Sequence, residues 1–184
     1  MIPVTKPTLV PLSVPWKVDS GCPRLQLFAF ESASDGPTRI RLSGFFGPIQ
    51  FSNEANATSD KDAHEQQQES VYHDIEVVFH DSLASRLLPG FSDSEIIQES
   101  LYDWSMINVD YSIRDGVEEF QRRFWNTWRQ TGLCPDPGVY SIEFSDWLRI
   151  LSPKADDFKH FMICGHDSYI EVVARTFSWT LTKD

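Results

Sequence analysis

FKHFMICGHDSYIEVVARTFSWTL, residues 158–181, is the stretch that decides the fold class. Two segments rich in apolar and β-branched residues, 158–164 and 169–175, flank the turn-forming residues GHDS at 165–168. This arrangement predicts a β-hairpin. A third strand is expected at 176–181, where apolar and polar residues alternate. Three consecutive strands with short connections indicate antiparallel pairing.

Outside this stretch, most of the remaining apolar segments also predict strands. Residues 81–100 are mixed in character, with a short helical turn expected at 94–100. The predicted strand at 38–42 alternates apolar and basic side chains, so one of its faces should contact water. The further predicted strands are 25–30, 38–42, 71–80, 101–113 and 139–144.

The clearest single element is a helix from about Gly116 to Thr131, with Gly132 as its C-terminal stop. Asp115 and Glu118 have the spacing of a capping box at its start. The expected apolar face consists of Val117, Phe120, Phe124 and Trp128. The i,i+4 ion pairs expected on the opposite face are Glu118–Arg122 and Glu119–Arg123.

These patterns predict one α+β domain over residues 1–184, with an antiparallel or mixed β-sheet and one principal amphipathic helix, about 116–131, packed on it. Four prolines recur at every fourth position between residues 3 and 15, so residues 1–23 are expected to form an extended arm along the surface. Residues 52–70 contain no large apolar side chain and predict a mobile polar loop.

Charge is distributed unevenly along the chain. The formal net charge is −11, and residues 42–113 contain thirteen acids and two bases, so the whole imbalance lies in the middle of the chain. Such a field repels nucleic acids and anionic membranes and favours a basic protein partner. The alternative is that the charge serves solubility alone.

The cysteines and the N-terminal sequence indicate the cellular compartment of the protein. The three cysteines contain no CxxC pair, which argues against a disulfide framework and a structural zinc site. Neither a signal peptide nor a membrane-spanning run is recognised. We therefore expect a cytoplasmic protein with reduced thiols and no cofactor.

A candidate partner-binding surface lies between residues 91 and 111, where acids surround aromatic side chains and no base occurs. Aromatic anchors provide affinity and carboxylates provide steering toward a basic partner. The alternative is that the aromatic residues belong to the core and the acids to a solvated face. The candidate contact residues are Asp93, Glu95, Glu99, Tyr102, Asp103, Trp104 and Asp110.

Two weaker candidates for chemistry lie near the C-terminal hairpin. Cys164, His166 and Asp167 place a thiol, an imidazole and a carboxylate in one turn, as a nucleophile, its base and an orienting acid would require. Alternatively, His160, Cys164 and His166 could hold a soft metal ion, because His160, Met162 and Cys164 share one face of an extended strand. The simpler interpretation is that these residues are core and turn residues.

The predicted function is therefore a non-catalytic, acidic protein-binding protein. In general character, though in no motif, the chain resembles the bacterial immunity-type inhibitors that neutralise basic toxins or enzymes. The alternatives are a small enzyme using the Cys-His-Asp or metal site around 160–167, and a structural or scaffold subunit. The oligomeric state is not indicated by the sequence.

Overall fold

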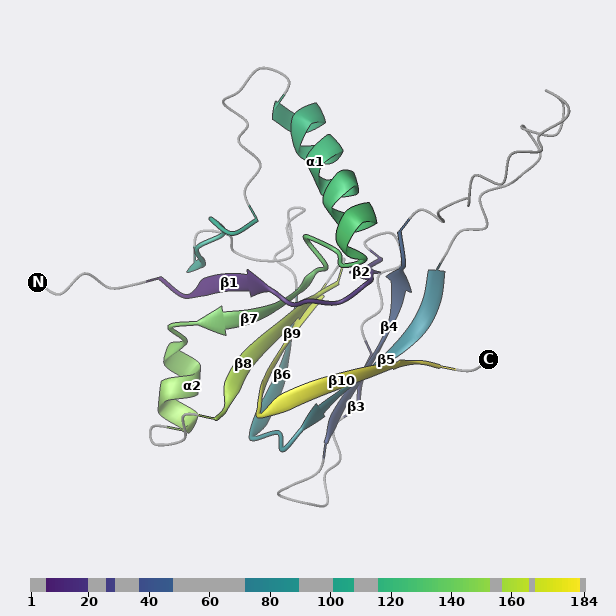
Figure 1. The fold of residues 1–184 in the computed structure, drawn as a ribbon. Helices are drawn as coiled ribbons and strands as arrows, with labels where there is room; N and C mark the ends of the chain where they lie inside the picture. Colours follow the sequence, from purple (N-terminus) through teal and green to yellow (C-terminus); the bar gives the residue numbers. More distant parts are fainter. Residues whose placement is uncertain are drawn as a thin grey trace, which may run out of the picture.

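The computed structural model describes residues 6–19, 26–28, 37–47, 72–89, 101–107, 116–152, 157–165 and 168–182. These residues form two antiparallel sheets and two helices (Figure 1). The first sheet has the order β1-β7-β8-β9-β6, and the second has the order β10-β5-β4-β2, with β3 also paired to β4. The strands are β1 Thr8–Pro11, β2 Lys17–Val18, β3 Gln26–Phe28, β4 Thr38–Phe45, β5 Tyr72–His80, β6 Ala84–Pro89, β7 Val139–Glu143, β8 Lys159–Cys164, β9 Ser168–Ala174 and β10 Thr176–Leu181, and the helices are α1 Gly116–Thr131 and α2 Asp146–Leu151.

The C-terminal prediction is confirmed: β8 and β9 form an antiparallel hairpin, and β10 follows. Only Arg175 separates β9 from β10, yet the two strands belong to different sheets. The partner strands β5 and β6 change sheets at the same point, after the three residues 81–83. Because three residues there oppose two in the partner strand, the ribbon contains a bulge, with Asp81 at φ 53°. This bent ribbon connects the two sheets.

The main core lies between the two sheets. Alternate residues of the central strands point inward, and Phe79 of β5 meets Phe161 of β8 across the interior with ring centroids 5.2 Å apart. Val14 and Trp16, from the proline-rich segment, are also fully buried in this core. The expected position along the surface therefore does not hold for residues 6–19, the part of this segment that the structure describes. Its prolines fix an extended backbone, and the apolar residues between them enter the core.

A second, smaller core covers the outer face of the first sheet. It contains Leu9, Tyr140 and Met162, and residues 101–107 pack over it. These residues form turns and a single parallel bridge between Asp103 and Thr8, so the strand predicted there is wrong over the described part. The Asp and Asn residues that interrupt its apolar pattern are more compatible with turns.

Helix α1 has the bounds expected from the sequence, but it does not lie across a sheet (Figure 1). Trp128 is its one large buried side chain; its indole N–H donates to the Pro15 carbonyl at 3.3 Å, and its ring lies 5.8 Å from that of Phe45. The helix is therefore anchored near its C-terminal end and extends away from the sheets. Of the predicted ion pairs, Glu119–Arg123 is present at 3.5 Å, whereas Arg122 pairs with Glu119 in place of Glu118.

Four described elements were not predicted: the short strands β1 and β2, which lie in the expected extended arm, strand β6 and helix α2. Strand β6 lies in the segment of mixed pattern, and helix α2 begins after Ser145, whose Oγ accepts the Leu148 N–H at 3.0 Å as an N-cap. The predicted loop at 52–70, the helical turn at 94–100 and the capping residue Asp115 lie outside the described residues.

Candidate functional site

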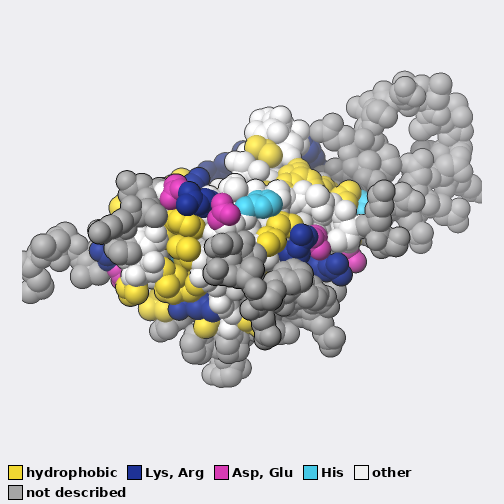
Figure 2. Space-filling view, turned by 90° about the horizontal axis from the view of Figure 1, so that it is seen from below, with side chains coloured by type: hydrophobic (Ala, Val, Ile, Leu, Met, Phe, Trp, Pro, Cys, Tyr) yellow, Lys and Arg dark blue, Asp and Glu magenta, His cyan; other side chains and the backbone are white. Residues whose placement is uncertain are grey.

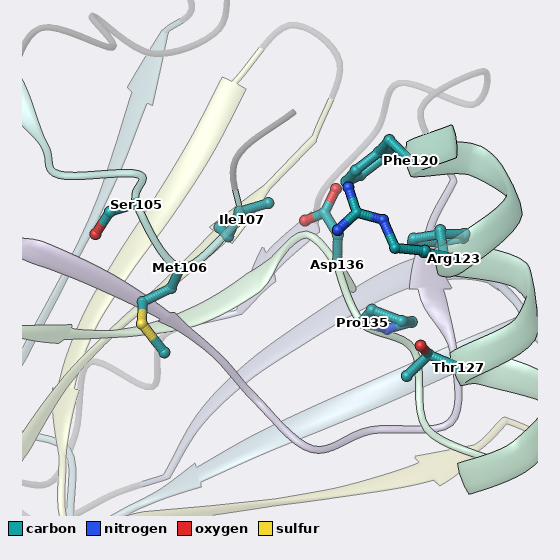
Figure 3. A pocket seen from close by; sticks show the side chains of 9 residues that line it. Ser105, Met106, Ile107, Phe120, Arg123, Thr127, Pro135 and Asp136 are labelled. Carbon is teal, nitrogen blue, oxygen red and sulfur yellow. The ribbon is translucent and has the colours of Figure 1, made fainter. Parts of the chain in front are cut away.

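An open groove of about 310 Å³ lies between helix α1 and residues 105–107 (Figure 3). Both apolar and charged side chains line it. The side chains of Arg123, on α1, and Asp136, in the loop before β7, point toward the same space. The lining residues are Ser105, Met106, Ile107, Phe120, Arg123, Phe124, Thr127, Pro135 and Asp136.

Helix α1 carries an aromatic surface that is only partly covered, and two of its residues, Phe120 and Phe124, line the groove. Phe120, Phe124 and Trp125 are half-buried, and Val117, one turn before Phe120, is 46% exposed. The rings support one another: Trp125 stacks on Trp128 with centroids 5.7 Å apart and an interplanar angle of 4°. An ordered aromatic surface loses little conformational entropy when a partner covers it. We call Val117, Phe120, Phe124 and Trp125 the α1 aromatic face.

The opposite wall carries Met106, which is 61% exposed. Tyr102 and Trp104, two residues predicted to anchor a partner, instead connect this wall to the residues behind it. The Tyr102 hydroxyl donates to Glu171 Oε1 at 2.8 Å, and the Trp104 ring packs edge-on against Tyr140 at 6.0 Å. Both aromatic side chains thus contact the second core, in agreement with the core alternative.

Asp103, the third described residue of the predicted surface, closes the turn. Its Oδ1 accepts the Ser105 N–H at 2.9 Å, and this hydrogen bond lowers the pKa of the Asp103 carboxyl. Its backbone pairs with the segment around β1, through Leu9 N–H to Asp103 O at 3.1 Å. The remaining predicted contact residues, Asp93, Glu95, Glu99 and Asp110, lie outside the described residues.

Glu171 of β9 is the centre of a buried polar cluster beside the second core. It is fully buried and lies directly opposite Arg86 of β6, whose guanidinium pairs with Oε2. Tyr102 binds the other carboxylate oxygen. On β8, His160 Nε2 lies 3.6 Å from Glu171 Oε2, which is longer than a hydrogen bond but close enough for electrostatic attraction. The cluster connects residues 101–107 to the first sheet.

The protonation states in this cluster follow from burial and charge. Burial opposes ionisation of Glu171, but His160, the Tyr102 hydrogen bond and Arg86 together outweigh it and lower the pKa of the carboxyl. Burial, with a smaller effect of the Glu171 charge, raises the pKa of Tyr102 above its ordinary value. At neutral pH Glu171 is therefore ionised, and Tyr102 is a hydrogen-bond donor.

Ser145, His160 and Glu171 have the residue types of a catalytic nucleophile, base and acid. Ser145 Oγ lies 2.7 Å from His160 Nδ1. However, Ser145 is only 5% exposed, and its Oγ also accepts the Leu148 N–H to cap α2. The hydroxyl is therefore inaccessible to a substrate, and this set of contacts fixes α2 to the sheet.

The surroundings of Cys164, the thiol candidate for catalysis, disfavour its thiolate form. Burial is the main cause that raises the pKa of the Cys164 thiol, so the thiol is protonated at neutral pH. Its proposed partners, His166 and Asp167, lie outside the described residues. Cys134 is also a free, buried cysteine, and burial raises its pKa to about 12.

The described metal candidates lie beside the second core. His160 is buried, Met162 belongs to this core, and Cys164 packs against it. Within the described ranges, no group of three or more His, Cys, Asp or Glu side chains is placed to hold a metal ion. His166 lies outside those ranges.

Charge on the described part of the protein is nearly balanced. Twelve of the twenty-seven acids and eleven of the sixteen lysines and arginines lie there, so ten of the eleven net negative charges belong to the other segments. In Figure 2, the described surface seen from below carries acidic and basic side chains interleaved, with hydrophobic side chains beside them. A basic partner would therefore be attracted mainly by those other segments.

Comparisons of the chain with models of protein families, with curated proteins and with solved structures found no match. Among the described residues, no helix is both long and apolar enough to cross a membrane.

The groove itself was not predicted. The apolar periodicity of α1 was visible in the sequence, but the same periodicity is expected whether a helix is covered by its own sheet or left partly open. The N-cap serine before α2 was a usable signal for that helix.

Proposed function

We propose that this chain is a non-catalytic protein-binding protein and that the α1 aromatic face, with the adjoining groove, is its contact surface. The observation that carries the proposal is the partial exposure of four large apolar side chains on one helix face beside a groove. Contiguous exposed apolar surface of this kind is typical of protein interaction sites. Aromatic residues in such a surface commonly contribute most of the binding energy.

We propose further that the partner is basic. The net charge is −11, and the segments that adjoin the groove walls in the sequence contain Asp93, Glu95, Glu99 and Asp110. Within the groove, the Asp136 carboxylate already pairs with Lys17 at 3.3 Å and accepts the Tyr140 hydroxyl, so the attraction would come mainly from the other segments. Apolar contact would provide affinity, and the acids would accelerate encounter and select against acidic partners and nucleic acids. An immunity-type inhibitor of a basic toxin or enzyme in the cytoplasm of a bacterium has this combination of features.

The contacts of the candidate catalytic groups favour binding over catalysis. Ser145 caps a helix, Glu171 is paired with Arg86 and Tyr102, and the Cys164 thiol is protonated. Each group thus has a structural role or lacks the activation that a nucleophile requires.

The test is capture of partners from the source cell with the tagged full chain, at low and at moderate salt, read by mass spectrometry. We expect a basic protein in near-stoichiometric amount, with slower association at the higher salt because screening weakens steering. Reversing the charges of Asp93, Glu95 and Glu99 is expected to slow association further. The proposal is contradicted if no partner is recovered. It is also contradicted if the association rate of the recovered partner changes neither with salt nor with charge reversal.

A further inference from the structure

The edge strands of the two sheets differ in how they are protected against pairing with another chain. An unprotected edge exposes backbone N–H and C=O groups that can accept a further strand, so most proteins cover, shorten, charge or interrupt their edges. The outer side of β1 pairs with Asp103, whose N–H donates to the Pro7 carbonyl at 2.8 Å. Strand β6 carries Arg86 and ends at Pro89. Strands β2 and β3 have two and three residues.

Strand β10 has none of these protections. Its six residues, TFSWTL, include no proline and no charged side chain, and within the described residues it pairs only with β5 (Figure 1, yellow). The Thr182 N–H donates to the Asp74 carbonyl at 2.9 Å, which places the backbone groups of the even-numbered residues toward β5. The backbone groups of Phe177, Trp179 and Leu181 therefore point away from β5, into the free edge.

The side chains of β10 leave this edge accessible. Phe177 and Trp179 are half-buried against the main core, while Thr176, Ser178 and Thr180 are exposed on the other face. The strand is thus held firmly by its own core, and its exposed face carries only hydroxyl groups.

We infer that β10 pairs antiparallel with β10 of a second copy of this chain, about a two-fold axis at Trp179. In this register Phe177 lies opposite the partner's Leu181, and Trp179 lies opposite the partner's Trp179. All three residues with outward backbone groups then form hydrogen-bonded pairs. Two-fold dimers are the commonest homo-oligomers, and their interfaces use the same surface on both copies.

The choice of a second copy as occupant rests on charge. In a two-fold pairing, every side chain of the strand faces a side chain of the same strand from the other copy. A strand with charges of one sign would therefore oppose like charges across the interface. Strand β10 has no charge to oppose, although the chain as a whole carries −11. The pairing would join the two β10-containing sheets into one continuous antiparallel sheet, and it uses none of the groove residues.

The oligomeric state of the full chain tests this inference. Light scattering after size exclusion, over a range of concentrations, is expected to give twice the 21.1 kDa chain mass at the upper end. In the proposed register, Ser178 lies opposite the partner's Thr180. The double variant Ser178→Lys and Thr180→Lys therefore places two pairs of like charges across the interface, and we expect its dimer dissociation constant to rise about tenfold or more.

The matched control is Ser178→Glu with Thr180→Lys, which changes the same two exposed positions but places opposite charges across the axis. This variant is expected to dimerise at least as well as the unmodified chain. A monomer at every concentration overturns the inference. Equal dimer dissociation constants for the Lys-Lys and Glu-Lys variants also overturn the inference, because residues 178 and 180 then do not face each other across the interface.

Discussion

The aromatic residues between the two sheets and those on helix α1 are chemically alike, but their surroundings differ. Phe79 and Phe161 are buried between the two sheets. By contrast, the side chains of Phe120, Phe124 and Trp125 are covered only in part. Burial of an apolar side chain stabilises the fold in proportion to the area removed from water. The first group therefore contributes most to the stability of the fold, whereas the second leaves apolar area uncovered.

The largest expected effect is on the covered group. Phe161→Ala removes a ring from the middle of the main core, and we expect it to lower the free energy of unfolding by about 3–5 kcal/mol. Urea denaturation measures this loss. A loss below about 1 kcal/mol would contradict the assignment of Phe161 to a fully packed core.

A smaller effect is expected where the groove wall is joined to the sheet. Arg86→Ala leaves the buried Glu171 carboxylate without its guanidinium, and a cost of about 2 kcal/mol is expected, since Arg86 is itself partly exposed.

Arg39→Ala is the matched control, because Glu76 is bound by both Arg39 and Arg41 and has access to water. Its cost should be below about 1 kcal/mol. Equal losses in the two variants would show that burial of Glu171 has no energetic consequence.

The same cluster predicts a dependence of stability on pH. The pKa of Glu171 is lowered in the folded protein, so its contribution is fully present above the ordinary carboxyl pKa and is lost as the pH falls through the folded value. Glu171→Gln should therefore flatten the decline of unfolding free energy on the acid side. Parallel pH profiles for the variant and the unmodified chain would refute this.

The elements that the sequence predicted are those with regular periodicity. The hairpin around residues 165–168 and helix α1 depend on local patterns that persist in the fold. Features that depend on distant partners were missed. Val14 and Trp16 lie between prolines, which mask their apolar pattern in the sequence. Whether Tyr102 packs inward or faces a partner depends on its hydrogen bond to Glu171, which is 69 residues away. From the sequence alone, a glutamate in a strand such as Glu171 is expected to face solvent, and only the second core explains its burial.

For the candidate site, composition indicated the approximate region but not the surface. The aromatic and acidic content of residues 91–111 indicated a contact surface there. Within the described part of this stretch, Met106 lines the groove, whereas Tyr102 and Trp104 pack inward. Sequence periodicity of α1 identified an apolar face, but only the arrangement of the sheets determines that this face stays partly uncovered.

The most direct test of the central claim is the affinity of the captured partner for two aspartate variants. Val117→Asp places a charge on the α1 aromatic face, and Ile150→Asp places one at a 76% exposed position on α2. Both side chains are exposed, so both variants should fold. We predict that titration calorimetry will show binding weakened by at least about tenfold, or 1.4 kcal/mol, for Val117→Asp and unchanged for Ile150→Asp. Equal affinities for the two variants would contradict the assignment of the α1 aromatic face as the contact surface.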